Sequence, residues 1–176
     1  MTLTAPEKQF LELLVYQREL ERVTDKFELW RKPAPLKGAC GGRGAGAKSR
    51  SVSSLLVQKL EYSRKRWFCG REIQKSLEES SYALILDQIK RLGYKDWEGV
   101  KSSSKIINRR NGSYFYFGGI RDEKKAKGLK GLEDFDGAWI DEGEDIPMDV
   151  WDILIPTFRK DDSEIWITFN RNKDID

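Results

Sequence analysis

The residues best suited to chemistry lie in a glycine-rich segment that ends in a lysine and a serine. Residues 41–49 read Gly-Gly-Arg-Gly-Ala-Gly-Ala-Lys-Ser, between the apolar run Leu36–Cys40 and the helical pattern Ser49–Leu60. Glycines let several backbone N–H groups approach one anion, and the amino terminus of the following helix adds positive potential. In this layout Lys48 would reach the outer phosphates of a nucleotide, and the Ser49 hydroxyl would bind magnesium. The sequence therefore predicts a phosphate-binding loop.

The segment departs from the strict phosphate-loop pattern at one position. That pattern is G-x-x-x-x-G-K-[ST], and counting from Gly42, Ala47 stands where the second glycine belongs. If this position needs a positive φ, an alanine costs about 1 kcal/mol. A glycine-rich turn that holds no ligand is the alternative for this segment taken alone.

Two adjacent carboxylates form a second candidate site. The apolar residues Ala138–Ile140 run into Asp141 and Glu142, which is typical of a buried strand with acidic residues at its end. Successive strand side chains point opposite ways, so the two carboxylates cannot do the same job. In phosphate-loop enzymes the first holds the magnesium shell, and the second can activate the attacking water. The alternative is a strand that enters an acidic loop, because Glu144 and Asp145 follow.

Polar residues at the end of another predicted strand would lie at the same end of the sheet. Glu164–Asn170 reads as a core strand, and the two-residue period puts Thr168 and Asn170 on one face. Polar side chains there could sense a γ-phosphate, or the strand could simply run out into solvent.

Arg71 follows another predicted strand, Trp67–Cys69. Ligands of parallel sheets sit beyond the carboxyl ends of the strands, where this arginine falls. It could contact a phosphate, or it could pair with Glu72 or Glu78.

Composition limits the chemistry. The chain has 176 residues, 35% of them charged, with a net charge of +3 and 11% aromatic residues. This favours one packed domain and excludes a strongly basic nucleic-acid binder as a whole. The chain contains no histidine, which excludes histidine metal sites and the Ser-His-Asp triad. Catalysis must use carboxylates, lysine, arginine and hydroxyl groups.

The sequence carries no signal for a membrane or for secretion. No run approaches the roughly 20 apolar residues of a membrane span, and no secretory signal is visible at the start. Cys40 and Cys69 both fall at ends of predicted buried strands. We expect them to be free buried thiols in a reducing compartment.

Hydrophobic periodicity and turn residues predict alternating strands and helices. This alternation predicts an α/β fold with a mostly parallel sheet. Asn111-Gly112 predicts an added antiparallel hairpin. Expected helices cover 4–24, 49–60, 73–92 (ended by Gly93) and 147–156; expected strands cover 27–30, 36–40, 67–69, 105–109, 113–117, 138–142 and 164–170.

Residues 118–131 are rich in lysine, with Lys124, Lys125, Lys127 and Lys130 between glycines. Such a segment could touch DNA phosphates. A solvated loop is the alternative.

Four stretches together resemble the ATPase domain of the phage large terminase subunit, the motor that packages DNA into viral procapsids. The resemblance covers about residues 36–173 and implies a RecA-like phosphate-loop NTPase fold, with helices on both faces of the sheet. The stretches are 41–49, quoted above; CGREIQKS at 69–76; LKGLE at 129–133 running into WIDE at 139–142; and WDILIPT at 151–157 with SEIWITFN at 163–170.

The resemblance implies a role for each matching residue. Asp141 matches the magnesium-coordinating Walker B aspartate, and Glu142 matches the catalytic glutamate. Thr168 and Asn170 match the motif that couples hydrolysis to DNA movement. Arg71 is similar to an arginine that approaches the γ-phosphate of its own or a neighbouring subunit. The nucleotide-binding set is Gly42, Arg43, Gly44, Ala45, Gly46, Ala47, Lys48, Ser49 and Arg50, with Gln9 similar to a glutamine that reads adenine.

The sequence departs from the family pattern in two ways. The family's loop resembles G-G-R-G-[SA]-[GA]-K-S, which is one residue shorter between Arg43 and Lys48. The family's full-length proteins also carry a C-terminal metal-dependent nuclease domain, and this chain ends at Asp176. We therefore expect a single ATPase domain over residues 1–176, with 1–30 as a helical segment packed on it, and no nuclease activity.

The predicted function is an ATP-hydrolysing motor that uses ATP and Mg²⁺ to move double-stranded DNA into a procapsid. Expected partners are double-stranded DNA, the portal protein and the small terminase subunit, with no membrane. We expect a homo-oligomeric ring during packaging, with a monomer allowed in isolation, in the host cytoplasm on the procapsid. The alternatives are a phosphate-loop nucleotide or small-molecule kinase, and a degenerate, non-hydrolysing DNA-binding or assembly module.

Overall fold

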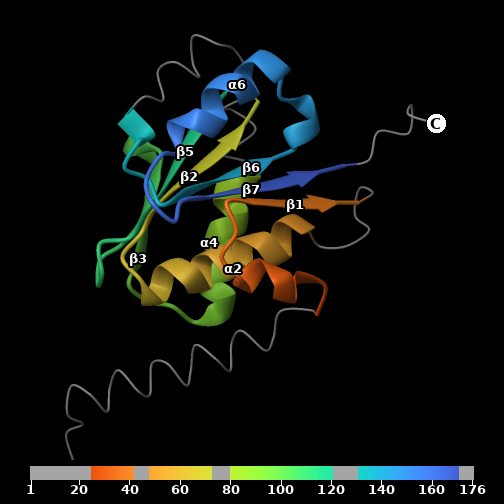
Figure 1. Ribbon diagram of the computed structural model, residues 1–176. Helices are drawn as coiled ribbons and strands as arrows, with labels where there is room; N and C mark the ends of the chain where they lie inside the picture. Colours follow the sequence, from red (N-terminus) through yellow and green to blue (C-terminus); the bar gives the residue numbers. More distant parts are fainter. Residues whose placement is uncertain (1–24, 42–47, 73–79, 121–130, 171–176) are drawn as a thin grey trace, which may run out of the picture.

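The computed structural model describes residues 25–41, 48–72, 80–120 and 131–170. These residues form a seven-stranded sheet with the order β1-β7-β6-β2-β5-β4-β3 (Figure 1). The strands are β1 (Leu36–Cys40), β2 (Arg66–Arg71), β3 (Trp97–Val100), β4 (Lys105–Asn108), β5 (Tyr114–Gly119), β6 (Gly137–Asp141) and β7 (Glu164–Phe169).

The sheet is mostly parallel. β1, β7, β6, β2 and β5 run in one direction. β4 pairs antiparallel with β5, and β3 pairs antiparallel with β4. The parallel strands therefore all end along one side of the sheet, here called the carboxyl edge, and begin along the opposite side, the amino edge. This arrangement confirms the predicted α/β fold and its hairpin.

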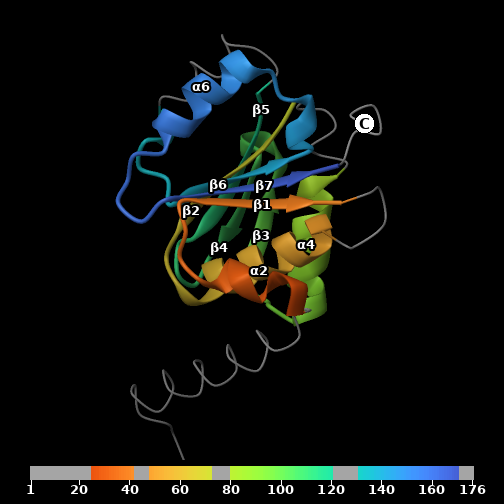
Figure 2. The ribbon, with the colours of Figure 1, turned by 45° about the vertical axis from the view of Figure 1, so that its right-hand side comes forward.

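Helices cover both faces of the sheet, as predicted. α2 (Lys48–Tyr62) and α4 (Ser81–Leu92) lie on one face, and α6 (Met148–Thr157) lies on the other (Figures 1 and 2). Each layer seals its own apolar cluster: Leu56 and Ile85 pack with Trp166 on the first face, and Val150 packs with Ile140 on the second. A parallel sheet buried on both sides needs these two layers.

Three short 3-10 helices lie wholly within the described residues: η1 (Asp25–Arg31), η2 (Lys101–Ser103) and η4 (Gly143–Asp145). The first replaces the strand predicted over residues 27–30, so that prediction is wrong. Phe27 and Trp30 are both buried, and the three-residue period of this helix places them on one side, whereas a strand would separate them. Trp30 packs edge-on against Trp166, with ring centroids 5.0 Å apart.

The other predicted elements agree with the structure apart from their ends. Gly93 adopts a φ of 77° and ends α4, as predicted for a left-handed cap. The predicted helix at 73–92 is described only from Ser81, and the one at 4–24 lies outside the described residues. Pro147 precedes α6 as its N-cap, and the helix continues one residue past Pro156.

The prediction of two buried thiols is half wrong. Both cysteines are free, but Cys40 is exposed and only Cys69 is buried. Cys40 lies at the end of β1, which is an edge strand, so no neighbouring strand covers it on one side. Within the described residues, no helix combines the length and apolar character needed to cross a membrane.

A buried ion cluster joins β7 to β1 and α2 at the amino edge. One oxygen of Glu164 accepts hydrogen bonds from Lys37 Nζ at 3.1 Å and Lys59 Nζ at 2.7 Å, and from the Trp166 ring N–H at 2.7 Å. Burial acts to raise the pKa of Glu164, but the bond and charge of Lys59, with Trp166 and Lys37, outweigh it and hold the pKa below 4.5. Burial lowers the pKa of Lys37 despite its pairing with Glu164.

We expect Glu164 to make the free energy of unfolding fall as the pH is lowered into the acidic range. Its folded pKa lies below the unfolded value of 4.5, so the unfolded state binds more protons and stability is lost as pH falls through the folded pKa. Urea unfolding should show Glu164→Gln destabilised at pH 7. Its deficit relative to wild type should shrink below pH 4.5. A deficit that stays constant with pH would contradict this assignment.

Gly137 at the start of β6 has no room for a side chain. A Cβ there would lie 2.4 Å from the Glu164 carbonyl oxygen and 2.6 Å from the Trp67 ring. Because both neighbours are rigid, Gly137→Ala should cost about 3 kcal/mol in the free energy of unfolding measured with urea. Gly131→Ala is the matched control, because no atom of the residues that the structure describes lies within 4 Å of its Cβ position. Equal effects of the two substitutions would show that this close packing is not limiting.

Candidate nucleotide site at the carboxyl edge

The predicted site residues that the structure describes converge at the carboxyl edge. α2 begins at Lys48 and Ser49, and β6 ends at Asp141. Thr168 of β7 stands beside Asp141 in the sheet register. Asn170 directly follows β7, and Arg71 is the last residue of β2.

The ammonium group of Lys48 bridges two strand ends. It donates to the Gly41 carbonyl oxygen at 2.6 Å and to Asn170 Oδ1 at 3.2 Å. These bonds hold the amine between the residue after β1 and the residue after β7. A lysine in this position presents its charge at the edge of the sheet, where a phosphate could replace either oxygen.

Both carboxylate oxygens of Asp141 accept hydrogen bonds. Its Oδ1 accepts hydrogen bonds from Ser49 Oγ at 2.9 Å and Thr168 Oγ1 at 2.6 Å. Its Oδ2 accepts one from Ser81 Oγ at 3.2 Å. The Trp139 ring N–H donates to Thr168 Oγ1 at 3.0 Å, so the threonine hydroxyl is directed at the carboxylate. Asp141 is buried, and a buried carboxylate needs such donors.

Glu142 leaves the strand alternation that the sequence suggested. β6 ends at Asp141, and Glu142 has φ 55° and ψ 51°. This left-handed conformation is strained for a residue other than glycine and is found often at functional sites. The turn separates the two carboxylates, so Asp141 is buried under hydroxyl groups while Glu142 remains partly exposed.

Arg71 forms an ion pair with Glu142, a partner that the sequence did not suggest. Its guanidinium also donates to Ser80 Oγ at 2.8 Å. Among the predicted acidic partners, Glu78 lies outside the described residues. The pair joins the ends of β2 and β6, which are neighbours in the sheet.

Glu144 extends the site beyond the predicted residues. Its Oε1 accepts a hydrogen bond from Asn170 Nδ2 at 2.6 Å. Its Oε2 is buried without a hydrogen-bond partner among the described residues. Sequence reasoning placed Glu144 in an acidic loop and did not consider Ser81 or Trp139 in the site. Only a serine at a helix start and an acidic residue after a strand marked these positions, and such signals are common.

The oxygen donors present suit magnesium. Mg²⁺ prefers hard oxygen ligands and usually combines one or two carboxylates with substrate phosphates and water. Ser49 Oγ and Asp141 Oδ1 already lie within hydrogen-bond distance. No group of three or more Asp, Glu or Cys side chains suited to a metal occurs in the described ranges, so phosphate would have to complete the shell.

Not all of the predicted binding residues fall within the described ranges. Gln9 and residues 42–47, including Arg43 and Ala47, lie outside the described residues, as do Lys124, Lys125, Lys127 and Lys130. Arg50 is described and exposed in the first turn of α2. The roles predicted for these residues remain predictions.

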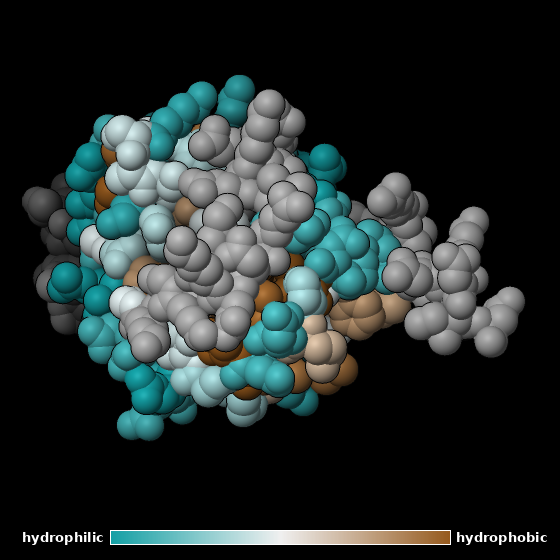
Figure 3. Space-filling model, turned by 90° about the horizontal axis from the view of Figure 1, so that it is seen from above, coloured by the Kyte–Doolittle hydropathy of each residue, from teal (hydrophilic) through white to brown (hydrophobic). Residues whose placement is uncertain are grey.

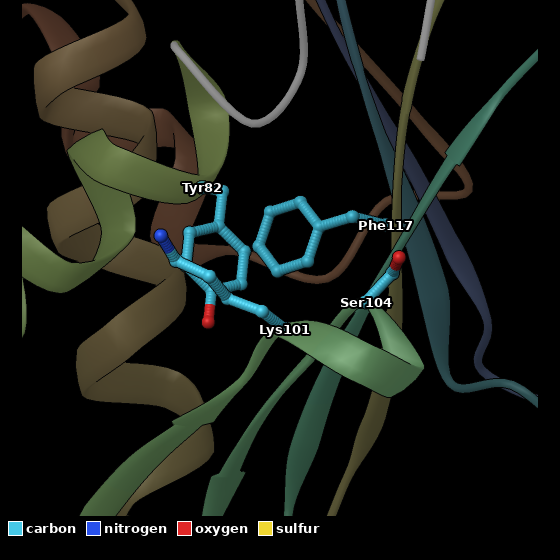
Figure 4. A pocket seen from close by; sticks show the side chains of 4 residues that line it. All are labelled: Tyr82, Lys101, Ser104 and Phe117. Atoms are coloured by element: carbon cyan, nitrogen blue, oxygen red, sulfur yellow. The ribbon is translucent and has the colours of Figure 1, made fainter. Parts of the chain in front are cut away.

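A small hollow between α4 and the hairpin does not fit a nucleotide. Tyr82, Lys101, Ser104 and Phe117 line it (Figure 4), and its volume is about 40 Å³. That volume holds a few water molecules, whereas pockets for larger ligands reach several hundred Å³. The open carboxyl edge is the better candidate for a nucleotide.

Comparison with known proteins identifies the family of this chain. The family model described as phage terminase large subunit matches residues 36–175. The chain belongs to this family. No curated protein matches the sequence.

Solved terminases share the RecA-like fold. The large terminase of a thermophilic bacteriophage, in complex with ADP, has a TM-score of 0.64 at 16% identity over 88% of this chain and 38% of that one. The ATPase domain of the Thermus phage P74-26 large terminase has a TM-score of 0.58 at 18% identity, over 84% of this chain and 69% of that one. The HK97 bacteriophage large terminase has a TM-score of 0.60 at 13% identity, over 97% of this chain and 33% of that one. This terminase chain thus spans 38% of the first of these proteins and 33% of the last.

The Thr168 hydroxyl should contribute strongly to stability. Thr168→Val removes the donor to Asp141 and leaves the buried Trp139 N–H without its acceptor. Together these losses should cost about 3 kcal/mol in urea unfolding. Thr168→Ser keeps the hydroxyl and loses one methyl group, so it should cost only about 0.8 kcal/mol. If serine proves as damaging as valine, the hydrogen bonds are not the cause.

Proposed function

We propose that this terminase chain binds ATP with Mg²⁺ and hydrolyses it as the motor domain of a viral DNA-packaging machine. Hydrolysis would drive double-stranded DNA into a procapsid. The observation that carries the proposal is the meeting of Lys48, Ser49 and Asp141 at one edge of the sheet. The fold neighbours include the large terminase of the thermophilic bacteriophage in complex with ADP and with ATP-γ-S.

Each described residue of the site has a role in this proposal. Lys48 would exchange its bond to Asn170 for the β- and γ-phosphates. Ser49 and Asp141 would hold the metal, which neutralises charge on the phosphates when bound. Thr168 would keep the Asp141 carboxylate in position, and Asn170 would respond to the phosphate through Lys48, a route from hydrolysis to the end of β7.

Glu142 and Arg71 would act as a pair. A general base must be free to accept a proton from the attacking water, but Glu142 is engaged by Arg71. A γ-phosphate that attracts the Arg71 guanidinium would release Glu142 and place a positive charge where negative charge develops. The same contact would thus keep hydrolysis low until the triphosphate is present.

The partners in the wider assembly are a proposal that family membership supports. We propose duplex DNA, a portal protein and a small terminase subunit as partners, with several copies in a ring on the procapsid in the host cell. Family membership supports this, and one solved neighbour is described as a DNA packaging motor, with a TM-score of 0.54. The single-domain boundary at 1–176 and the packing of 1–30 remain predictions.

The two alternatives predict different products. A kinase would need an acceptor other than water, whereas Glu142 at the site edge favours water as nucleophile. A degenerate module would not bind ATP, and the departures at Ala47 and in loop length make that alternative worth testing. Titration with a fluorescent ATP analogue, followed by phosphate release without an acceptor, separates all three.

Glu142→Gln should keep ATP binding and abolish turnover. The substitution preserves shape but removes the proton acceptor, so phosphate release should fall by at least about 100-fold. Affinity for the fluorescent analogue should stay near that of wild type. Glu98→Gln is the control, because Glu98 is exposed and pairs with Arg109 on the hairpin side. Hydrolysis at the wild-type rate by Glu142→Gln would refute the assignment.

A further inference from the structure

A second hollow, which is polar, lies at the amino edge, whereas Lys48 and Asp141 lie at the carboxyl edge. Its volume is about 410 Å³, and its lining residues are Arg64, Arg66, Gly112, Tyr114, Asp136 and Lys160. These come from segments that precede β2, β5, β6 and β7, or from the first residues of those strands. The strands begin towards the left of Figure 1, and the left margin of Figure 3 is mainly hydrophilic.

The hollow carries excess positive charge. Within the described ranges, three cationic side chains line it against one carboxylate, that of Asp136. Asp136 Oδ1 accepts from Lys160 Nζ at 2.6 Å and lies 3.8 Å from Lys65 Nζ, and Oδ2 accepts from the Arg66 backbone N–H at 2.8 Å. Burial acts to raise the pKa of Asp136, but Lys160 and the Arg66 N–H outweigh it and leave the pKa below its usual value. Asp136 is therefore ionised and orders Lys160 without neutralising the hollow.

The two arginines are the cations still available to a ligand. Both are exposed, and neither guanidinium has an ion pair or hydrogen bond within the described part of the chain. Arg64 lies over the turn at Gly112, whose Cβ position would be 3.6 Å from its Nε. Planar guanidinium groups match phosphate oxygens in a bidentate way.

The lining favours a nucleic-acid backbone over a protein surface. Among the described residues that line the hollow, none has an aliphatic side chain, whereas protein interfaces have an apolar core. Tyr114 adds a hydroxyl of the kind that contacts phosphates. β5, β2, β6 and β7 are consecutive in the sheet, so the basic row is about 14 Å long at about 4.8 Å per strand. That length matches about four base pairs at about 3.4 Å each.

We propose that this basic hollow, centred on Arg64 and Arg66, binds the phosphate backbone of duplex DNA. The choice of duplex DNA as the polyanion rests on the proposed packaging function, while the anion site follows from the geometry. DNA would then contact the edge of the sheet away from the nucleotide. Because β6 and β7 run from one edge to the other, a displacement of these strands at the nucleotide would also displace their amino ends at the DNA.

The test compares two double variants of the full chain that lose the same charge. Arg64→Gln with Arg66→Gln removes the proposed contacts. Lys90→Gln with Arg91→Gln removes two exposed cations from the last turn of α4. Binding of a fluorescent duplex of about 20 base pairs is measured by anisotropy over a salt series. Circular dichroism melting establishes that both variants fold.

The first variant should bind DNA about 60-fold more weakly at about 0.1 M salt, and its salt slope should fall by about 1.8. The control should stay close to wild type. Unchanged DNA binding by the arginine variant, or an equal loss in the control, would overturn the proposal. So would a variant that keeps DNA affinity but loses binding to polyglutamate, because the hollow would then accept acidic polypeptide.

Phosphate release without DNA separates this inference from the proposed function. The arginine variant should hydrolyse ATP at the wild-type rate, because its changes lie at the opposite edge. If wild type does not hydrolyse ATP, the proposed function fails. The DNA affinities of the wild type and the two double variants still test the DNA site. A loss of DNA-free hydrolysis in the folded arginine variant would count against a separate site.

Discussion

The Asp141 carboxylate is the contact on which the site depends. It lies at the end of β6 and is held by hydroxyl groups from α2, α4 and β7. A carboxylate removed from water is stable only if donors replace the lost hydration. These bonds fix where α2 and α4 begin relative to the sheet, and the start of α2 places Lys48. Loss of one donor would therefore disturb both the packing and the site.

Burial of both sheet faces confines polar chemistry to the two edges. Apolar layers under α2 and α4 on one side, and under α6 on the other, leave no room for unpaired charge within the sheet. The carboxyl edge combines Lys48 with Asp141, Glu142 and Glu144. The amino edge contains Glu164 deep in the packing and a basic row at the surface. The two edges are joined by strands only five or six residues long, so a change at one edge need not travel far.

Local patterns predicted much of the fold because they report on local physics. Glycine at Gly93 and Asn111-Gly112 marked turns, and apolar runs marked β2, β6 and β7, since strands buried on both faces of a parallel sheet are mostly apolar. The prediction was wrong for Phe27 and Trp30, because a short apolar run fits a strand and a 3-10 turn equally well. β3 was missed because its four residues include Glu98 and Gly99, which do not mark a strand. The partners of Trp97 are distant in sequence: its ring centroid lies 5.5 Å from that of Phe115, and its ring N–H donates to Glu61 Oε2 at 2.6 Å.

The sequence alone determined which residue types could bind a nucleotide: a lysine and a serine opening a helix, and two carboxylates at the end of an apolar strand. Only the tertiary structure decided their partners. Ser81 reaches Asp141, Arg71 pairs with Glu142, and Glu144 meets Asn170 because β2, β6 and β7 are neighbours in the sheet. The same strand order collects Arg64, Arg66 and Lys160 into one hollow. Periodicity encodes which face of an element is buried, but not which strands lie side by side, and contacts between strand ends depend on that order.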